Sequence, residues 1–230
     1  MAAQDMQQRR GLREGRLVVA LSHFATITLL PRVVPAFHAR WPGVQLSIIP
    51  PTFQLGGLRE GEPDFAVMSL PAERLGAEFS ARSIYATNVA VVVRAGHPLA
   101  HATSLAATRD ADWLLPSLES SVTRGLHRAF RQARLGTPRC LVTCQTLTGF
   151  ELLARHSDLV AAVPVEVYEA RAATSDLVRL PLADTIEGPR VAVLRWADSR
   201  ATPASADLEE AFVQAAHQMA RTQGTRNKRK

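Results

Sequence analysis

The sequence predicts an α/β protein made of two lobes that two crossings of the chain connect. An apolar strand at Leu17–Ser22, a helical segment ending at Trp41 and a second strand at Val44–Ile49 form a strand–helix–strand unit near the start. A second alternation of helices and strands follows Ala95–Leu99, and a late strand at Arg190–Trp196 returns the chain to the first lobe. Helices that alternate with strands imply parallel sheets, which bind ligands beyond the carboxyl ends of their strands.

Strands are predicted where apolar and β-branched residues gather between turn signals. One of them, Val89–Arg94, is a continuous apolar run, which is typical of a strand buried on both faces. The predicted strands are Leu17–Ser22, Val44–Ile49, Asp64–Ser69, Ser80–Ser83, Val89–Arg94, Ala111–Leu115, Arg139–Cys144, Leu159–Val163, Leu177–Leu180 and Arg190–Trp196.

Helices are predicted where apolar residues recur at helical spacing. The last helix has the clearest start, because Thr202 can cap it and Pro203 suits its first position. The other predicted helices are Ala25–Trp41, Ser120–Arg134, Gly149–His156 and Val165–Ala172, with a short helix or turn at Leu55–Leu58. Pro35 is expected to kink the first of them.

The net charge of +6 belongs to the two ends of the chain. Residues 1–16 carry a net charge of +2 and residues 221–230 a net charge of +5, so the body between them has a net charge of −1. A basic tail can touch phosphate non-specifically, but a solvated, disordered tail at 222–230 is the favoured interpretation. The body therefore does not look like a nucleic-acid binder. With no apolar run long enough to span a bilayer and no signal peptide, a cytoplasmic protein is expected.

The two cysteines, Cys140 and Cys144, are expected to be free and buried. Four residues of strand separate their Cα atoms by about 13 Å. A disulfide needs Cα atoms within about 7 Å. No further cysteine or histidine stands at metal-ligand spacing, so we expect no metal and no cofactor.

Four segments in order give the chain a family resemblance. Gly15–Leu17 leading to Trp41–Val44, then Leu58–Val67, Arg94–Ala100 and Leu159–Pro164, resemble the effector-binding domain of LysR-type transcriptional regulators over residues 15–221. The resemblance implies a bilobed, type 2 periplasmic-binding-protein-like fold. It implies a first subdomain at 16–95 and 190–221, a second at 96–189, and a remnant of the linker helix at 1–15. The family's winged helix-turn-helix has no counterpart here, so the chain is expected to contact DNA only through that missing part.

The family binds its ligand between the lobes, with amides at helix starts and short hydroxyl side chains that suit a small anion. Carried over by position, the ligand-binding residues are Ser22, His23, Phe24, Thr52 and Phe53 in the first lobe and Ser117, Leu118, Thr146 and Leu147 in the second. Five of them have a structural alternative. Ser22 and Thr146 could simply cap helices, His23 could face solvent, and Phe24 and Phe53 could belong to the core.

Another candidate surface is a row of arginines on the predicted helix Ser120–Arg134. Arg124, Arg128, Arg131 and Arg134 could bind an anion or a partner, although a solvated helix face explains them better.

The resemblance implies a ligand sensor that forms homodimers, with the helix ending at Trp41 and the helix Ser120–Arg134 as contact faces, and tetramers in the intact regulator. The effector would be a small organic acid, and an aromatic acid is suggested by the branch that the chain resembles. Two alternatives remain. One is a solute receptor of a transport system, which would need a secretion signal. The other is an enzyme on the same fold. The sequence supports no catalytic triad and no phosphate-binding glycine loop, so a non-enzyme is expected.

Overall fold

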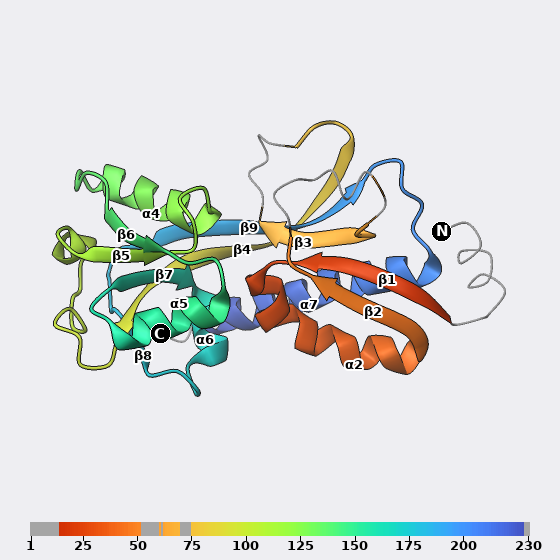
Figure 1. Cartoon of the computed structure of the whole chain (residues 1–230), viewed down its shortest axis with the longest axis horizontal. Coiled ribbons are helices and arrows are strands. Elements are labelled where there is room, and N and C mark those ends of the chain that lie inside the picture. The colour runs from red at the N-terminus through yellow and green to blue at the C-terminus, as the bar shows by residue number, and fades with distance from the viewer. Residues whose placement is uncertain (1–13, 52–59, 61, 70–74, 228–230) are drawn as a thin grey trace. The chain divides into compact units, whose positions relative to one another are not determined.

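The computed structural model describes residues 14–51, 60, 62–69 and 75–227 (Figure 1). The described chain divides into two units, one made of the residues up to Tyr85 and from Arg190 onward, the other of Ala86–Pro189. The resemblance implied a first boundary after residue 95. The division falls earlier, inside a long strand.

The sheet of the first unit is mainly parallel. β1 (Glu14–Leu21) lies between β2 (Gly43–Ile49) and β3 (Phe65–Ser69) and runs parallel to both. β9 (Ile186–Trp196) pairs antiparallel with β3. The carboxyl ends of β1, β2 and β3 therefore lie at one edge of the sheet, as the sequence predicted.

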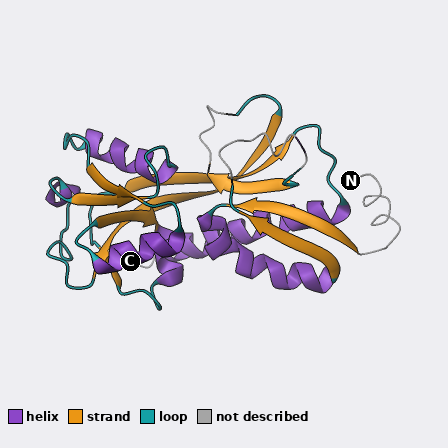
Figure 2. Ribbon diagram, viewed as in Figure 1, coloured by secondary structure: helices purple, strands orange, loops and turns teal. Residues whose placement is uncertain are grey.

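The helices of the first unit are η1 (Ala25–Leu29), α2 (Leu30–Arg40) and α7 (Pro203–Asn227) (Figure 2). η1 is a π-helical segment that continues into α2, and Pro35 lies within α2. The Trp41 indole nitrogen donates to the Asp207 carboxylate at 2.9 Å, which joins the end of α2 to α7. The predicted cap of α7 is confirmed, because the Ser205 amide donates to the Thr202 hydroxyl at 3.2 Å. The backbone of α7 continues to Asn227, within the stretch 222–230 that was expected to be a disordered tail.

Asp64 joins β1 to the turn before β3. Its Oδ2 atom accepts from the Val18 amide at 2.9 Å, and its own amide donates to the Val18 carbonyl at 2.8 Å. Desolvation raises the pKa of the Asp64 carboxyl, against the lowering effects of the Val18 hydrogen bond and the Arg195 charge. The carboxyl therefore serves the sheet as a half-buried hydrogen-bond acceptor.

In the second unit, β5 (Asp112–Leu115) runs parallel to β6 (Arg139–Thr143) and to β7 (Val160–Pro164). β4 (Phe79–Arg94) pairs antiparallel with β7 and with the short β8 (Leu177–Arg179). The helices that cover this sheet are α4 (Ser121–Gln132), α5 (Leu147–His156) and α6 (Val165–Arg171), with the 3₁₀ turn η3 at Leu105–Thr108.

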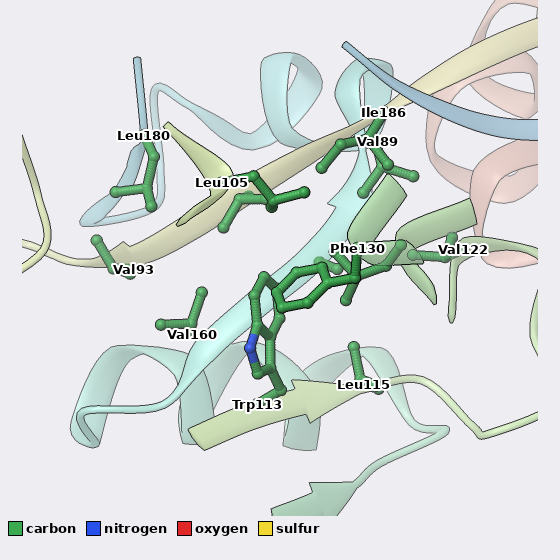
Figure 3. Packing of buried hydrophobic residues seen from close by; sticks show 13 residues of the cluster. Val89, Val93, Leu105, Trp113, Leu115, Val122, Phe130, Val160, Leu180 and Ile186 are labelled. Carbon is green, nitrogen blue, oxygen red and sulfur yellow. The ribbon is translucent and has the colours of Figure 1, made fainter. Parts of the chain in front are cut away.

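Two apolar clusters fill the two faces of this sheet. On one face Trp113 meets Phe130 of α4 edge to face, with ring centroids 5.7 Å apart (Figure 3). On the other face Phe150 and Ala154 of α5 pack on Leu114. A helix on each face explains why Trp113–Leu115 of β5 and Val160–Ala162 of β7 are buried and apolar, as strands of parallel sheets are.

A bulge in β6 separates the two cysteines. The register with β5 shifts between Trp113 and Leu114, so that Cys140 packs with the Trp113 cluster while Cys144 packs with the Leu114 cluster. The thiols therefore lie on opposite faces of the sheet and are free. The prediction that they are buried was wrong: both are half-buried, because β6 ends the strand order and is covered less completely.

Two other expectations were wrong. The predicted strands Ser80–Ser83 and Val89–Arg94 are one strand, β4, because Tyr85 and Thr87 continue the buried alternation and the Thr87 hydroxyl bonds to the Glu166 carboxylate. β9 begins before Gly188 instead of after it. A Cβ at Gly188 would lie 2.7 Å from the Thr87 carbonyl oxygen, so glycine here permits close approach of two backbones and does not end the strand.

Candidate ligand-binding site

The first group of candidate residues lies where β1 ends in the first unit. The Ser22 amide donates to the Val67 carbonyl of β3 at 3.0 Å, and the helical turns begin at His23. The Ser22 hydroxyl lies 3.4 Å from the Ala25 amide, which is long for a cap. The capping role foreseen for Ser22 is therefore present but weak. It leaves most of the hydroxyl's hydrogen-bonding capacity for another partner.

The turn after Ser22 is π-helical, and within it Thr28 bonds back to the chain. The Thr28 hydroxyl is buried and donates to the Phe24 carbonyl at 2.7 Å, and the Arg32 guanidinium donates to the Thr28 carbonyl at 3.1 Å. Short π-helical segments are frequent at functional sites. This one holds the first helical turn, with the His23 and Phe24 amides, at the edge where the parallel strands end.

His23 and Phe24 differ in what they present at this edge. The His23 side chain keeps an exposed surface, yet desolvation by the surrounding protein lowers the pKa of its imidazole. The ring is thus a neutral hydrogen-bonding group near neutral pH. The Phe24 side chain is 4% exposed and packs against Tyr85, with ring centroids 5.6 Å apart. Because the Phe24 ring belongs to the core, only the Phe24 backbone remains a candidate ligand contact.

The second group lies where β5 and β6 end in the second unit. These strands are parallel neighbours, and the Cys144 amide continues their pairing by donating to the Leu115 carbonyl at 3.0 Å. Ser117 follows β5 and Thr146 follows β6, so both hydroxyls lie at one edge of this sheet. Leu118 is 56% exposed and Leu147 is half-buried beside them.

Ser117 holds its place through its backbone and leaves its side chain without a partner. Its carbonyl accepts from the Thr123 hydroxyl at 2.6 Å, and Ser120 caps α4 by accepting from the Thr123 amide at 3.0 Å. The Ser117 hydroxyl is buried, and no hydrogen-bond partner for it is found in the described part of the chain. A buried hydroxyl without a partner costs about 1–3 kcal/mol, so a guest that bonds to it is stabilising.

Thr146 begins α5 without using its side chain as a cap. The Thr146 carbonyl accepts from the Phe150 amide at 2.9 Å, but the hydroxyl makes no capping bond and lies 3.6 Å from the Cys144 sulfur. Gly149 gives the hydroxyl room, because a Cβ there would lie 2.7 Å from Thr146 Oγ1. The structural alternative of capping is therefore not what Thr146 does.

Two of the predicted ligand-binding residues, Thr52 and Phe53, lie outside the described residues. Sequence reasoning missed Thr123, whose signal is its spacing of three from the helix cap Ser120.

Of the arginines on α4, Arg128 pairs with Glu187 at 3.1 Å and Arg124 bonds to the Ser121 hydroxyl at 2.9 Å. These two are engaged with neighbouring residues on an exposed helix face.

Within residues 14–51, 60, 62–69 and 75–227, no group of three or more His, Cys, Asp or Glu side chains could hold a metal ion. None of the helices described has both the length and the apolar character needed to cross a bilayer. The strand edge of the first unit offers a hydroxyl, helix-start amides and a neutral imidazole, and the strand edge of the second unit offers hydroxyls and helix-start amides. Each set by itself suits the oxygen atoms of a small polar ligand.

Comparisons with known proteins agree on one protein family. The model of the LysR substrate binding domain family matches residues 10–217. The HTH-type transcriptional regulator GalR of Pseudomonas putida is 28% identical over 182 residues, which are 78% of this chain and 46% of that protein. The chain thus spans about half the length of this curated relative.

Two solved structures show the same fold. The regulatory domain of CcmR from Synechocystis PCC6803, in complex with 2-PG, has a TM-score of 0.74 at 16% identity and covers 88% of this chain and 98% of its own. The effector binding domain of QuiR, in complex with shikimate, has a TM-score of 0.75 at 15% identity and covers 89% of this chain and 98% of its own. The bilobed, type 2 periplasmic-binding-protein-like α/β fold expected from the sequence is confirmed.

Proposed function

Because the chain belongs to the LysR substrate binding domain family, we propose that it is the ligand-sensing domain of a LysR-type transcriptional regulator. The family and the curated relative are regulators and not enzymes, in agreement with the sequence analysis. Regulation of transcription, a homodimer that becomes a tetramer in the intact regulator, contact with DNA through a helix-turn-helix and a place in the cytoplasm are parts of this proposal.

The effector we propose is a small organic acid, and an aromatic acid is the first class to test. The observation that carries this lies at the ends of two neighbouring parallel strands, where the Ser117 hydroxyl has no partner among the described residues and the Thr146 hydroxyl does not cap its helix. Hydroxyls and helix-start amides donate to carboxylate oxygens, and these bonds are stronger than those to neutral groups. The complexes of CcmR with 2-PG and of QuiR with shikimate support a small-molecule effector.

Ser22, the His23 imidazole and the His23 and Phe24 amides are the proposed contacts from the first unit, with Thr52 and Phe53 as further candidates there. Ser117, Leu118, Thr146 and Leu147 are those from the second. Binding to residues of both units would shift the population of the domain between an open and a closed form. This shift in population is the signal that we propose the domain gives when the effector binds.

The proposal is tested by thermal unfolding in the presence of aromatic and aliphatic carboxylates, with nucleotides and neutral sugars as negative controls. At least one acid is expected to raise Tm, because a ligand that binds only the folded state stabilises it. The proposal fails if no acid raises Tm, or if nucleotides or sugars do so in place of the acids.

Thr146→Ala supplies the residue-level test, with Thr148→Ala as the matched control on the same helix. Loss of a hydrogen bond to a charged ligand costs about 1.5–3 kcal/mol, or roughly 10- to 150-fold in Kd. We expect that loss for Thr146→Ala with no change in the Tm of the free protein, and little change for Thr148→Ala. Equal Kd values for the two variants would remove Thr146 from the site.

A further inference from the structure

His127 of α4 is a half-buried residue with a second buried polar atom that lacks a partner among the described residues. Its Nε2 atom is buried, and within the described ranges it has no hydrogen-bond partner. Desolvation, with a smaller contribution from the Arg131 charge, lowers the pKa of the His127 imidazole. The ring is therefore neutral near pH 7 and can exchange one hydrogen bond at Nε2 with a small polar group.

Thr123 connects the two unpartnered groups. Its hydroxyl donates to the Ser117 carbonyl at 2.6 Å, so Ser117 lies against the first turn of α4 at Thr123. His127 is four residues further along the same helix, and residues at this spacing share a face with Cβ atoms about 5–6 Å apart. Helical side chains lean toward the helix N-terminus, which directs the His127 side chain toward the turn that holds Thr123.

We propose that Ser117 Oγ and His127 Nε2 line one buried site that takes a single water molecule, with Thr123 Oγ1 as its third wall. A buried water makes two to four hydrogen bonds to polar groups that otherwise have no partner. Ser117 and His127 supply two of these bonds. The Thr123 hydroxyl donates to Ser117 and accepts from Ser120 at 2.8 Å, and its remaining lone pair supplies the third.

The water makes His127 a positioning residue for the loop between β5 and α4. It connects Ser117 to the middle of α4, in addition to the Thr123 bond at the first turn. Only the importance of this loop for the effector rests on the proposed function. The water site itself belongs to the free protein and is tested without any ligand.

The direct test is water–protein NMR on the free chain with labelled histidine. We expect cross-peaks between the His127 ring protons and a long-lived water, and we expect Ser117→Ala to abolish them and to shift the His127 Nε2 resonance. His101, which lies on an exposed turn, is the internal control and should show no such water. Absence of the cross-peaks, or their persistence in Ser117→Ala, overturns the proposal.

A double-mutant cycle in urea gives an independent test. Ser117→Ala and His127→Phe should each raise the unfolding equilibrium constant about 5-fold or more, because each leaves the other group without its bridge. The unfolding equilibrium constant of the double variant should rise by less than the product of the two single-variant factors, since removal of both polar groups leaves neither without a partner. For Ser117→Ala combined with His101→Phe, the constant should rise by the full product of the single-variant factors. If the Ser117–His127 pair also gives the full product, a shared water is contradicted.

Discussion

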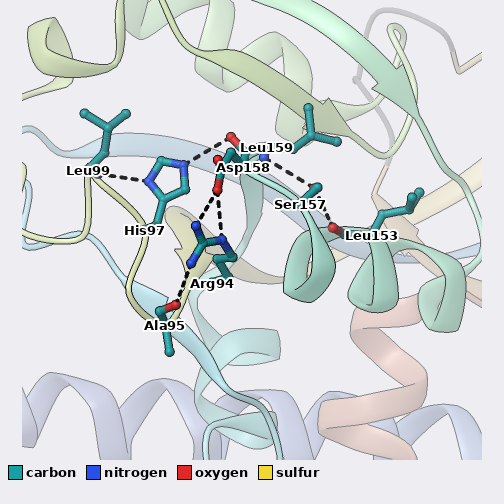
Figure 4. A network of polar contacts seen from close by, with 8 residues as sticks. All are labelled: Arg94, Ala95, His97, Leu99, Leu153, Ser157, Asp158 and Leu159. Atoms are coloured by element: carbon teal, nitrogen blue, oxygen red, sulfur yellow. Dashed lines mark hydrogen bonds and ion pairs between the residues drawn. The ribbon is translucent and has the colours of Figure 1, made fainter.

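The Nε2 atom of His97 lies 3.1 Å from the main-chain carbonyl oxygen of Asp158, sixty-one residues further along the chain (Figure 4). The Leu99 amide donates to Nδ1 of the same ring at 2.9 Å, so Nε2 carries the proton that Asp158 accepts. The Asp158 carboxylate pairs in turn with Arg94 at 2.7 Å. The buried imidazole therefore joins the turn after β4 to the loop before β7, inside the second unit.

His97→Ala is expected to destabilise the chain by about 1–3 kcal/mol, because the Leu99 amide and the Asp158 carbonyl both lose a buried partner. Urea unfolding measures this free energy. His101→Ala, a change of the same kind at an exposed position nearby, should stay within about 0.5 kcal/mol of the parent. An equally small effect at His97 would mean that the two contacts contribute nothing.

Gly125→Ala is expected to be destabilising although alanine favours helices. A Cβ at Gly125 would clash with the Glu187 carbonyl oxygen of β9, where backbone cannot give way cheaply. We expect a loss of about 1–3 kcal/mol from overpacking. In the absence of this contact, a gain of about 1 kcal/mol from helix propensity is expected. The sign of the change in Tm decides between the two, and Arg131→Ala on the exposed face of α4 serves as control.

The two helix starts of the second unit should respond differently to loss of their hydroxyls. Ser120 accepts from the Thr123 amide at 3.0 Å, so Ser120→Ala should cost about 1 kcal/mol of stability. Thr146 makes no such bond, so Thr146→Ala should cost less than about 0.5 kcal/mol. Denaturant unfolding of the two variants is the comparison. Similar losses would show that Thr146 also caps its helix in solution.

Asp64 should give stability a dependence on pH that Asp64→Asn removes. Desolvation raises the pKa of the folded carboxyl above its ordinary value of 3.8, so the folded state binds more protons than the unfolded state. The contribution of Asp64 to stability is then greatest below the unfolded pKa and declines as pH rises through the folded pKa. The asparagine oxygen can still accept from the Val18 amide. Unfolding free energies measured from about pH 4 to pH 7 should therefore favour the variant increasingly as pH rises. A constant difference would contradict the raised pKa.

Most strands and helices could be predicted because the evidence for them is local. The apolar period of two or 3.6 residues, the cap at Thr202 and the proline after it all stand within a few residues of the element that they define. Prediction failed at Gly188, where a glycine next to a proline has the same appearance in a turn as in a strand that another backbone approaches closely. It failed again for the cysteine environments, because whether a strand lies at a sheet edge depends on strand order.

The sequence by itself determined that Ser22, Ser117 and Thr146 follow the ends of strands, since chain order and hydrophobic period are properties of neighbouring residues. Only the tertiary structure decided what each hydroxyl does there. Ser22 makes a long cap, Thr146 makes none, and Ser117 is buried without a partner among the described residues while Ser120 and Thr123 hold its loop. The physical reason is that hydrogen bonding and desolvation depend on atoms that folding brings together from distant parts of the chain, and these atoms leave no trace in the local pattern.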